Sequence, residues 1–121
     1  MRTRRPIPAL LGLTAGLGLI ATTTAADPTS GEALERGKRI YEQTCVACHG
    51  ADGKGIVPGA PDLNKKNSGL SKPRPVLVEH VLEGFRSEGS PMAMPAGGGN
   101  PDLTEEEARA VVEYMLQRFG G

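Results

Sequence analysis

Residues 45–49 read Cys-Val-Ala-Cys-His, and this run constrains the chain more than any other feature. Two cysteines separated by two residues on a helical turn present both thiols to one edge of a flat macrocycle, where each can form a thioether with a haem vinyl group. The histidine that follows at once is then placed under the iron as its proximal ligand. The run therefore predicts one covalently bound c-type haem, attached through Cys45 and Cys48 and ligated by His49.

Other interpretations of this run explain less of it. A structural zinc site needs four ligands, typically in paired Cys/Cys or Cys/His sets, and the whole chain has two cysteines and two histidines. A thioredoxin-like redox pair would follow a strand in a βαβ pattern, and no strand pattern precedes Cys45. A disulfide between Cys45 and Cys48 could form, but it gives no reason for His49.

The first 26 residues are expected to be an export signal. They begin with three arginines, continue through an apolar stretch over residues 9–21, and end in small residues before a cleavage site expected after Ala26. The apolar stretch is shorter than the roughly 20 residues that a membrane-spanning helix needs, so retention as an uncleaved anchor is the less favoured alternative. The Arg4-Arg5 pair is compatible with the twin-arginine route. A periplasmic domain over residues 27–121, with no membrane span, is therefore expected.

This domain has little conventional core material. The chain contains no Trp, two Phe and two Tyr, but 17 Gly and 10 Pro. A domain this small buries a limited share of its surface, so a bound haem would supply the missing apolar bulk. Loss of the three N-terminal arginines would change the net charge from zero to −3, and no Lys/Arg tract indicates binding to nucleic acid.

Hydrophobic periodicity predicts an all-α fold, in which three or more helices and Gly/Pro-rich loops wrap around one haem. The first helix is expected to begin near Ser30, which can cap it, and to run directly into residues 45–49. A short helix is expected over about residues 75–83, where Pro75 suits the first turn and Gly84 ends the helix. No strand pattern, internal repeat or second domain stands out.

The last helix gives the clearest pattern. Thr104 and Glu107 form a capping box at its start. Its expected buried face consists of Ala108, Val111, Val112, Met115 and Phe119. Gly37 would let the first helix approach the last one closely, with Tyr41 and Tyr114 filling the crossing.

The second axial ligand of the iron has four candidates among the residues after the export signal. Met115 falls on the expected buried face of the last helix, and a lone helical histidine such as His80 is usually a surface or satisfied residue. Met92 and Met94 share a loop, and Met94 precedes a proline, which favours an extended backbone that can hold the side chain across a haem face. Met94 is therefore the preferred ligand, Met92 the next, and gap-filling against the porphyrin is the alternative for both.

A wider set of residues carries a family resemblance. It consists of Gly37, Tyr41, Cys45-x-x-Cys48-His49-Gly50, Pro61-Asp62-Leu63, Val81-Leu82-Glu83-Gly84, Met94-Pro95 and, in the last helix, Val111, Tyr114 and Met115. With these residues the whole region after the signal resembles a class I monohaem cytochrome c of the small bacterial type. The resemblance implies that the Pro61 carbonyl accepts a hydrogen bond from the His49 ring, that Met94 is the distal ligand, and that Leu63 lines the haem pocket.

Histidine on one side and methionine on the other would raise the haem reduction potential and fill both axial positions. The chain is therefore predicted to be a one-electron carrier and not an enzyme, a monomer that meets redox protein partners in transient complexes. Two alternatives stay open: a haem subunit of a periplasmic oxidoreductase complex, and a ligand-binding or sensing protein with an open distal site. Basic residues in the middle loops and an acidic last helix could orient the chain on a partner, although ordinary surface charge explains them equally well.

Overall fold

The computed structural model describes residue 24 and residues 26–120, so the expected export signal lies almost entirely outside it. Its helical segments are α1 (Gly31–Ile40), the π-helix η1 (Tyr41–Cys45), α2 (Val46–His49), the short 3₁₀ turns η2 (Gly69–Ser71) and η3 (Ala96–Gly99), α3 (Arg74–Glu83) and α4 (Glu105–Phe119). The described residues contain no strand, only one isolated antiparallel bridge between Phe85 and Met94. The predicted all-α architecture is confirmed.

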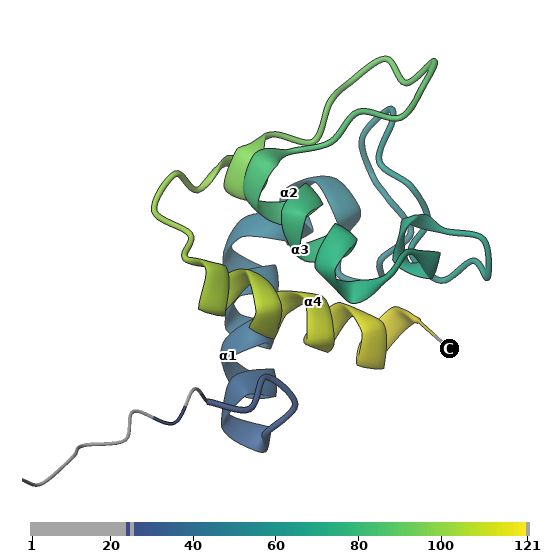
Figure 1. The fold of residues 1–121 in the computed structure, drawn as a ribbon. Helices are drawn as coiled ribbons and strands as arrows, with labels where there is room; N and C mark the ends of the chain where they lie inside the picture. Colours follow the sequence, from purple (N-terminus) through teal and green to yellow (C-terminus); the bar gives the residue numbers. More distant parts are fainter. Residues whose placement is uncertain (1–23, 25, 121) are drawn as a thin grey trace, which may run out of the picture.

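Helices α1 and α4 cross in the lower half of Figure 1, and Gly37 makes the crossing possible. A Cβ atom added at Gly37 would lie 2.2 Å from the backbone oxygen of Ala110 in α4, which is closer than a real side chain can approach. Beside this contact the rings of Tyr41 and Tyr114 pack with their centroids 5.7 Å apart. The predicted close approach and the aromatic pair beside it are both confirmed.

Helix α4 begins and packs as its sequence predicts. The Thr104 hydroxyl accepts a hydrogen bond from the Glu107 N–H at 3.3 Å, and the Glu107 carboxylate accepts one from the Thr104 N–H at 3.0 Å. All five residues of its expected inner face are buried: Ala108, Val111, Val112, Met115 and Phe119. Sequence patterning therefore predicted the helix, its cap and its buried face.

Helix α3 lies over α4, with Leu77, Val78 and Val81 buried, and an ion pair that the sequence did not predict joins the two helices. It begins at Arg74, one residue before the expected start, and ends at Glu83 before Gly84. The Arg74 guanidinium donates from Nε to the Glu113 carboxylate at 2.5 Å. Glu113 is 9% exposed, whereas the Arg74 side chain is 65% exposed, so a buried carboxylate on α4 finds its partner at the protein surface.

Two long loops complete the molecule, residues 50–68 and residues 84–95, and both extend above the helices on the right of Figure 1. The loops contact each other near Gly59, where an added Cβ would lie 2.7 Å from the Ser90 hydroxyl oxygen. Within the described part of the chain, no helix is both long and apolar enough to cross a membrane. The helices therefore lie on one side of the molecule and the two loops on the other.

Candidate haem-binding site

The Cys-x-x-Cys-His run lies where α1 continues into the π-helix η1 and then into α2. In η1 the Val46 N–H bonds to the Tyr41 carbonyl, five residues back, so the chain makes one wide turn just before the run. Cys45 is buried, Cys48 is half-buried, and both thiols are free. Burial, helped by the neighbouring Cys48, raises the pKa of Cys45 to about 11. Two free thiols on one short helical segment are therefore available for thioether formation.

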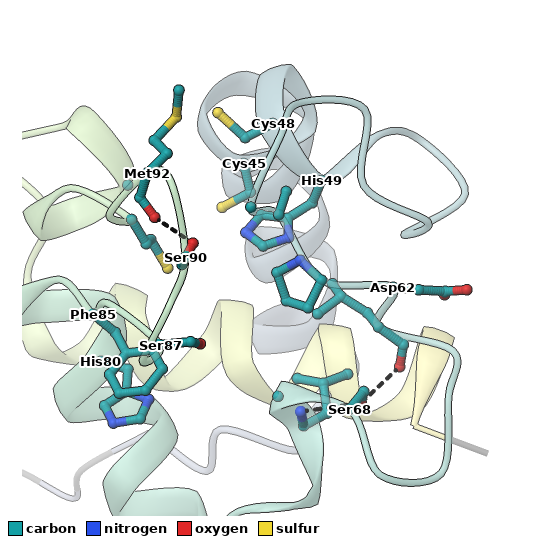
Figure 2. A pocket seen from close by; sticks show the side chains of 18 of the residues that line it. Cys45, Cys48, His49, Asp62, Ser68, His80, Phe85, Ser87, Ser90 and Met92 are labelled. Atoms are coloured by element: carbon teal, nitrogen blue, oxygen red, sulfur yellow. Dashed lines mark hydrogen bonds between the residues drawn. The ribbon is translucent and has the colours of Figure 1, made fainter.

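These residues open onto a cavity of about 720 Å³, a size usual for sites that bind small molecules and cofactors. Figure 2 shows Cys45, Cys48 and His49 on one wall, with Met92 and Ser90 across the open space. Met94 and Leu63 also line the cavity. Leu63 is 4% exposed, and its N–H donates to the Gly53 carbonyl at 2.7 Å, which fixes this part of the first loop. The sequence-predicted site residues therefore meet in one pocket.

The His49 imidazole is prepared for metal binding by its environment. Burial lowers the pKa of His49, so the ring is held in the neutral form that can ligate a metal. Its Nδ1 atom is buried and has no hydrogen-bond partner among the described residues. A buried polar atom normally has a partner, so this nitrogen is open to a bond that the described residues do not supply.

The predicted hydrogen bond from the His49 ring to the Pro61 carbonyl stays a prediction. Pro61 lines the same cavity as His49, and among the described residues the His49 Nδ1 atom has no hydrogen-bond partner.

The four candidates for the second axial ligand all line this cavity, but they are held differently. Met94 is half-buried, and its backbone exchanges two hydrogen bonds with Phe85, at 2.8 and 3.0 Å. Met92 is 50% exposed, and Met115 is fixed in the buried face of α4. The His80 ring stacks on Phe85 with a centroid separation of 3.9 Å. Met94 is the candidate that combines a fixed backbone, partial burial and a position outside a helix.

Two residues of the site were not singled out from the sequence. Gly98 in η3 has a positive φ of 65°, and a Cβ added there would lie 4.0 Å from the Cys45 sulfur, so η3 packs closely against the cysteine. In the sequence, residues 97–99 are three consecutive glycines, a pattern that is typical of a loop and does not indicate this contact. Phe85 was also missed, and its role depends on pairing with Met94 across a loop, for which the sequence carries no pattern.

Charges at the cavity are balanced. Lys65 and Lys72 line it, and so do Asp62 and Glu88. Of the other basic residues in the middle of the chain, Arg74 is engaged with Glu113. The cavity therefore does not carry a strong field of one sign.

Comparison with known proteins agrees with this geometry. The family described as "Cytochrome C oxidase, cbb3-type, subunit III" matches residues 32–115, which include the cysteine-histidine run and most of α4. This chain belongs to the cytochrome c family. A covalently bound c-type haem is therefore its cofactor, and two free thiols, an unbonded buried imidazole nitrogen and an enclosing cavity fit that group.

Named relatives in the cytochrome family are small proteins and subunits of larger ones. Cytochrome c-555 of Prosthecochloris aestuarii is 38% identical over 85 residues, which cover 69% of this chain and 85% of the relative. Cytochrome c-551 of Stutzerimonas stutzeri is 35% identical over 86 residues, covering 71% and 74%. The cbb3-type cytochrome c oxidase subunit CcoP of Rhodobacter capsulatus is 31% identical over 86 residues, which cover 70% of this chain and 29% of that subunit.

Proposed function

We propose that this cytochrome is a one-electron carrier whose haem is ligated by His49 and Met94. The observation that carries the proposal is the pairing of two residues on one cavity: a half-buried imidazole whose Nδ1 atom has no partner among the described residues, and a half-buried methionine whose backbone is fixed by hydrogen bonds to Phe85. Methionine and histidine together favour the ferrous state and raise the reduction potential.

The chain's own residues hold the haem in this proposal. Cys45 and Cys48 would attach it covalently, and both lie on one wall of the cavity beside His49 (Figure 2). Leu63 packs in the cavity and excludes water. When bound, the haem supplies an iron that alternates between ferric and ferrous forms by taking up and releasing one electron.

The carrier function depends on whether the iron keeps a free coordination position. If His49 and Met94 both held the iron, no position would remain for oxygen or substrate, and electron transfer would be the chemistry left. A carrier must bind and leave its partners quickly, through a small contact. Phe85 and Met92 line the cavity and are 37% and 50% exposed, so they offer such a contact on a monomer.

The proposal also includes export of the chain from the cytoplasm. Residues 1–26 direct the chain out of the cytoplasm and are removed after Ala26, and residues 27–121 work in the periplasm. The basic start, apolar middle and small residues of this segment support the assignment.

A second candidate function is a haem subunit of a larger oxidoreductase. The comparisons favour it in one respect, because the matching family and one relative bear the names of oxidase subunits. In that case the domain would purify with a larger partner. The coordination chemistry at His49 and Met94 would be the same.

The test is the optical spectrum of the haem-loaded protein and of two matched variants, Met94→Ala and Met92→Ala. We expect low-spin iron and no carbon monoxide binding in the unchanged protein and in Met92→Ala. Met94→Ala should lose the methionine–iron band and bind carbon monoxide in the ferrous form. The converse result would transfer the ligand role to Met92, and carbon monoxide binding by the unchanged protein would favour a ligand-binding or sensing function.

A further inference from the structure

Tyr41 forms hydrogen bonds near both ends of the haem-attachment run, residues 45–49. Its backbone carbonyl accepts the Val46 N–H, which closes the π-helix η1. Its side-chain hydroxyl donates to the carbonyl oxygen of Gly50 at 2.7 Å, in a buried site. A single residue of η1 therefore contacts the chain just after Cys45 and just after His49.

The Tyr41 side chain is itself held rigidly. It is 2% exposed, and its ring packs between Tyr114 and Phe119 of α4, with centroid separations of 5.7 and 5.3 Å. Burial raises the pKa of Tyr41 to about 12, so the hydroxyl keeps its proton and remains a donor near neutral pH. The hydrogen bond thus connects Gly50 to the fixed crossing of α1 and α4.

The turn at Gly50 is where the chain leaves α2. Gly50 is buried with a positive φ of 77°, and its carbonyl also accepts the Gly53 N–H at 3.2 Å. The carbonyls just before it, on Cys48 and His49, accept backbone N–H groups of the first loop, both at 2.9 Å. Tyr41 provides a side-chain hydrogen bond to Gly50 itself, while the Asn64 amide donates to the Asp52 carbonyl further along the same turn at 2.9 Å.

We infer that Tyr41 is a positioning residue for the proximal side of the haem: its hydroxyl fixes the turn at Gly50 and thereby the orientation of the His49 imidazole. The inference rests on the proposed role of His49 as proximal ligand. It adds that the crossing of α1 and α4 sets the orientation of the His49 ring, through the peptide bond between His49 and Gly50. A small rotation of a ligating ring changes its bonding to the metal, which is why residues that orient a ligand tune the site.

The test uses the haem-loaded protein with Tyr41→Phe, which keeps the ring and removes the hydroxyl. Tyr114→Phe is the matched control, because Tyr114 belongs to the same aromatic cluster and its hydroxyl makes no hydrogen bond to a described residue. Val112→Ala, a buried change in α4 away from the cavity lining, controls for lost stability alone. For each variant we would measure the reduction potential, the low-spin electron paramagnetic resonance signal and the shifted proton resonances of His49.

Tyr41→Phe should move all three readouts from their wild-type values, while Tyr114→Phe and Val112→Ala leave them in place. The lost hydrogen bond should also raise the unfolding equilibrium constant about two- to thirteen-fold. If Tyr41→Phe destabilises the protein but keeps the wild-type potential and His49 resonances, the hydroxyl is only structural and the inference is overturned. If the wild-type spectrum shows histidine ligation without methionine, the proposed function fails while this inference still stands or falls by the Tyr41→Phe readouts. If His49 does not ligate the iron at all, both fail.

A measurement on the unchanged protein covers the case in which Tyr41→Phe does not fold. The Tyr41 hydroxyl proton should be visible by nuclear magnetic resonance, exchange slowly with water, and show proximity to the Gly50 backbone. Rapid exchange of this proton would overturn the inference without any substitution.

Discussion

Gly37→Ala tests the crossing of α1 and α4 on which the site is built. The added Cβ would lie 2.2 Å from the Ala110 oxygen and 2.7 Å from its carbonyl carbon, whereas ordinary contacts begin at 3.4 Å, so the helices must separate by about 1 Å. Both atoms belong to backbone and cannot swing aside. Ala110 and its neighbour Val111 are 2% and 0% exposed, so the shift would disturb packing that has no slack.

The expected magnitude combines two opposing effects. Overpacking of a tight core costs about 1–3 kcal/mol, and the upper end applies because backbone is involved. Alanine gains about 1 kcal/mol over glycine inside a helix. The net loss in the free energy of unfolding is therefore about 2 kcal/mol, or roughly 8–16 °C in the melting temperature of a domain of this size.

The assay is urea unfolding of the haem-loaded protein, followed by circular dichroism. Gly31→Ala is the control, since it makes the same change at the start of α1, where a Cβ would meet nothing within 4 Å. Gly31→Ala should leave the unfolding midpoint close to that of the wild type. If Gly37→Ala is as stable as Gly31→Ala, the close helix crossing is not a requirement of the fold and the reasoning is refuted.

Three further predictions concern the cap of α4 and its ion pair with α3, and each can be checked by chemical or thermal unfolding. Thr104→Ala should lose about 1 kcal/mol at neutral pH, as is usual for a removed cap. Hydrogen bonds from Thr104 lower the pKa of Glu107 below its ordinary value of 4.5. The extra stability of the wild type over Glu107→Gln should therefore be fully present above pH 4.5 and be lost as the pH falls through the lowered pKa. A stability difference that stays constant down to acid pH would refute the cap. Arg74→Met should destabilise the protein by leaving the carboxylate of Glu113, whose side chain is 11% exposed, without its guanidinium. The double variant with Glu113→Gln should lose less than the two single losses combined, and strict additivity would mean that the pair is not coupled.

Much of the fold was predictable because its determinants are local. The capping box at Thr104 and Glu107, the apolar face of α4 and the helical stop at Gly84 depend on residues a few positions apart, and each was confirmed. The close approach at Gly37 was predictable as well, because a glycine within an apolar helical stripe leaves room for the backbone of a neighbouring helix.

What the sequence did not reveal depends on contacts between distant segments. No sequence pattern indicates the π-helix η1. Its hydrogen bonds join residues five positions apart and compete closely with the four-residue hydrogen bonds of an ordinary α-helix. The pair of Arg74 and Glu113 joins residues 39 positions apart. The bridge between Phe85 and Met94 forms across a loop, so the residue that holds the favoured axial methionine could not be named in advance.

The most direct test of the proposed His/Met electron carrier is an optical redox titration of the haem-loaded protein, carried out with and without carbon monoxide. We expect a single reversible one-electron transition at a positive potential, low-spin iron in both oxidation states, and a curve that carbon monoxide does not shift. A high-spin ferrous form whose apparent potential rises with carbon monoxide would contradict the proposal, because an axial position would then be open and the protein would bind ligands instead of only carrying electrons.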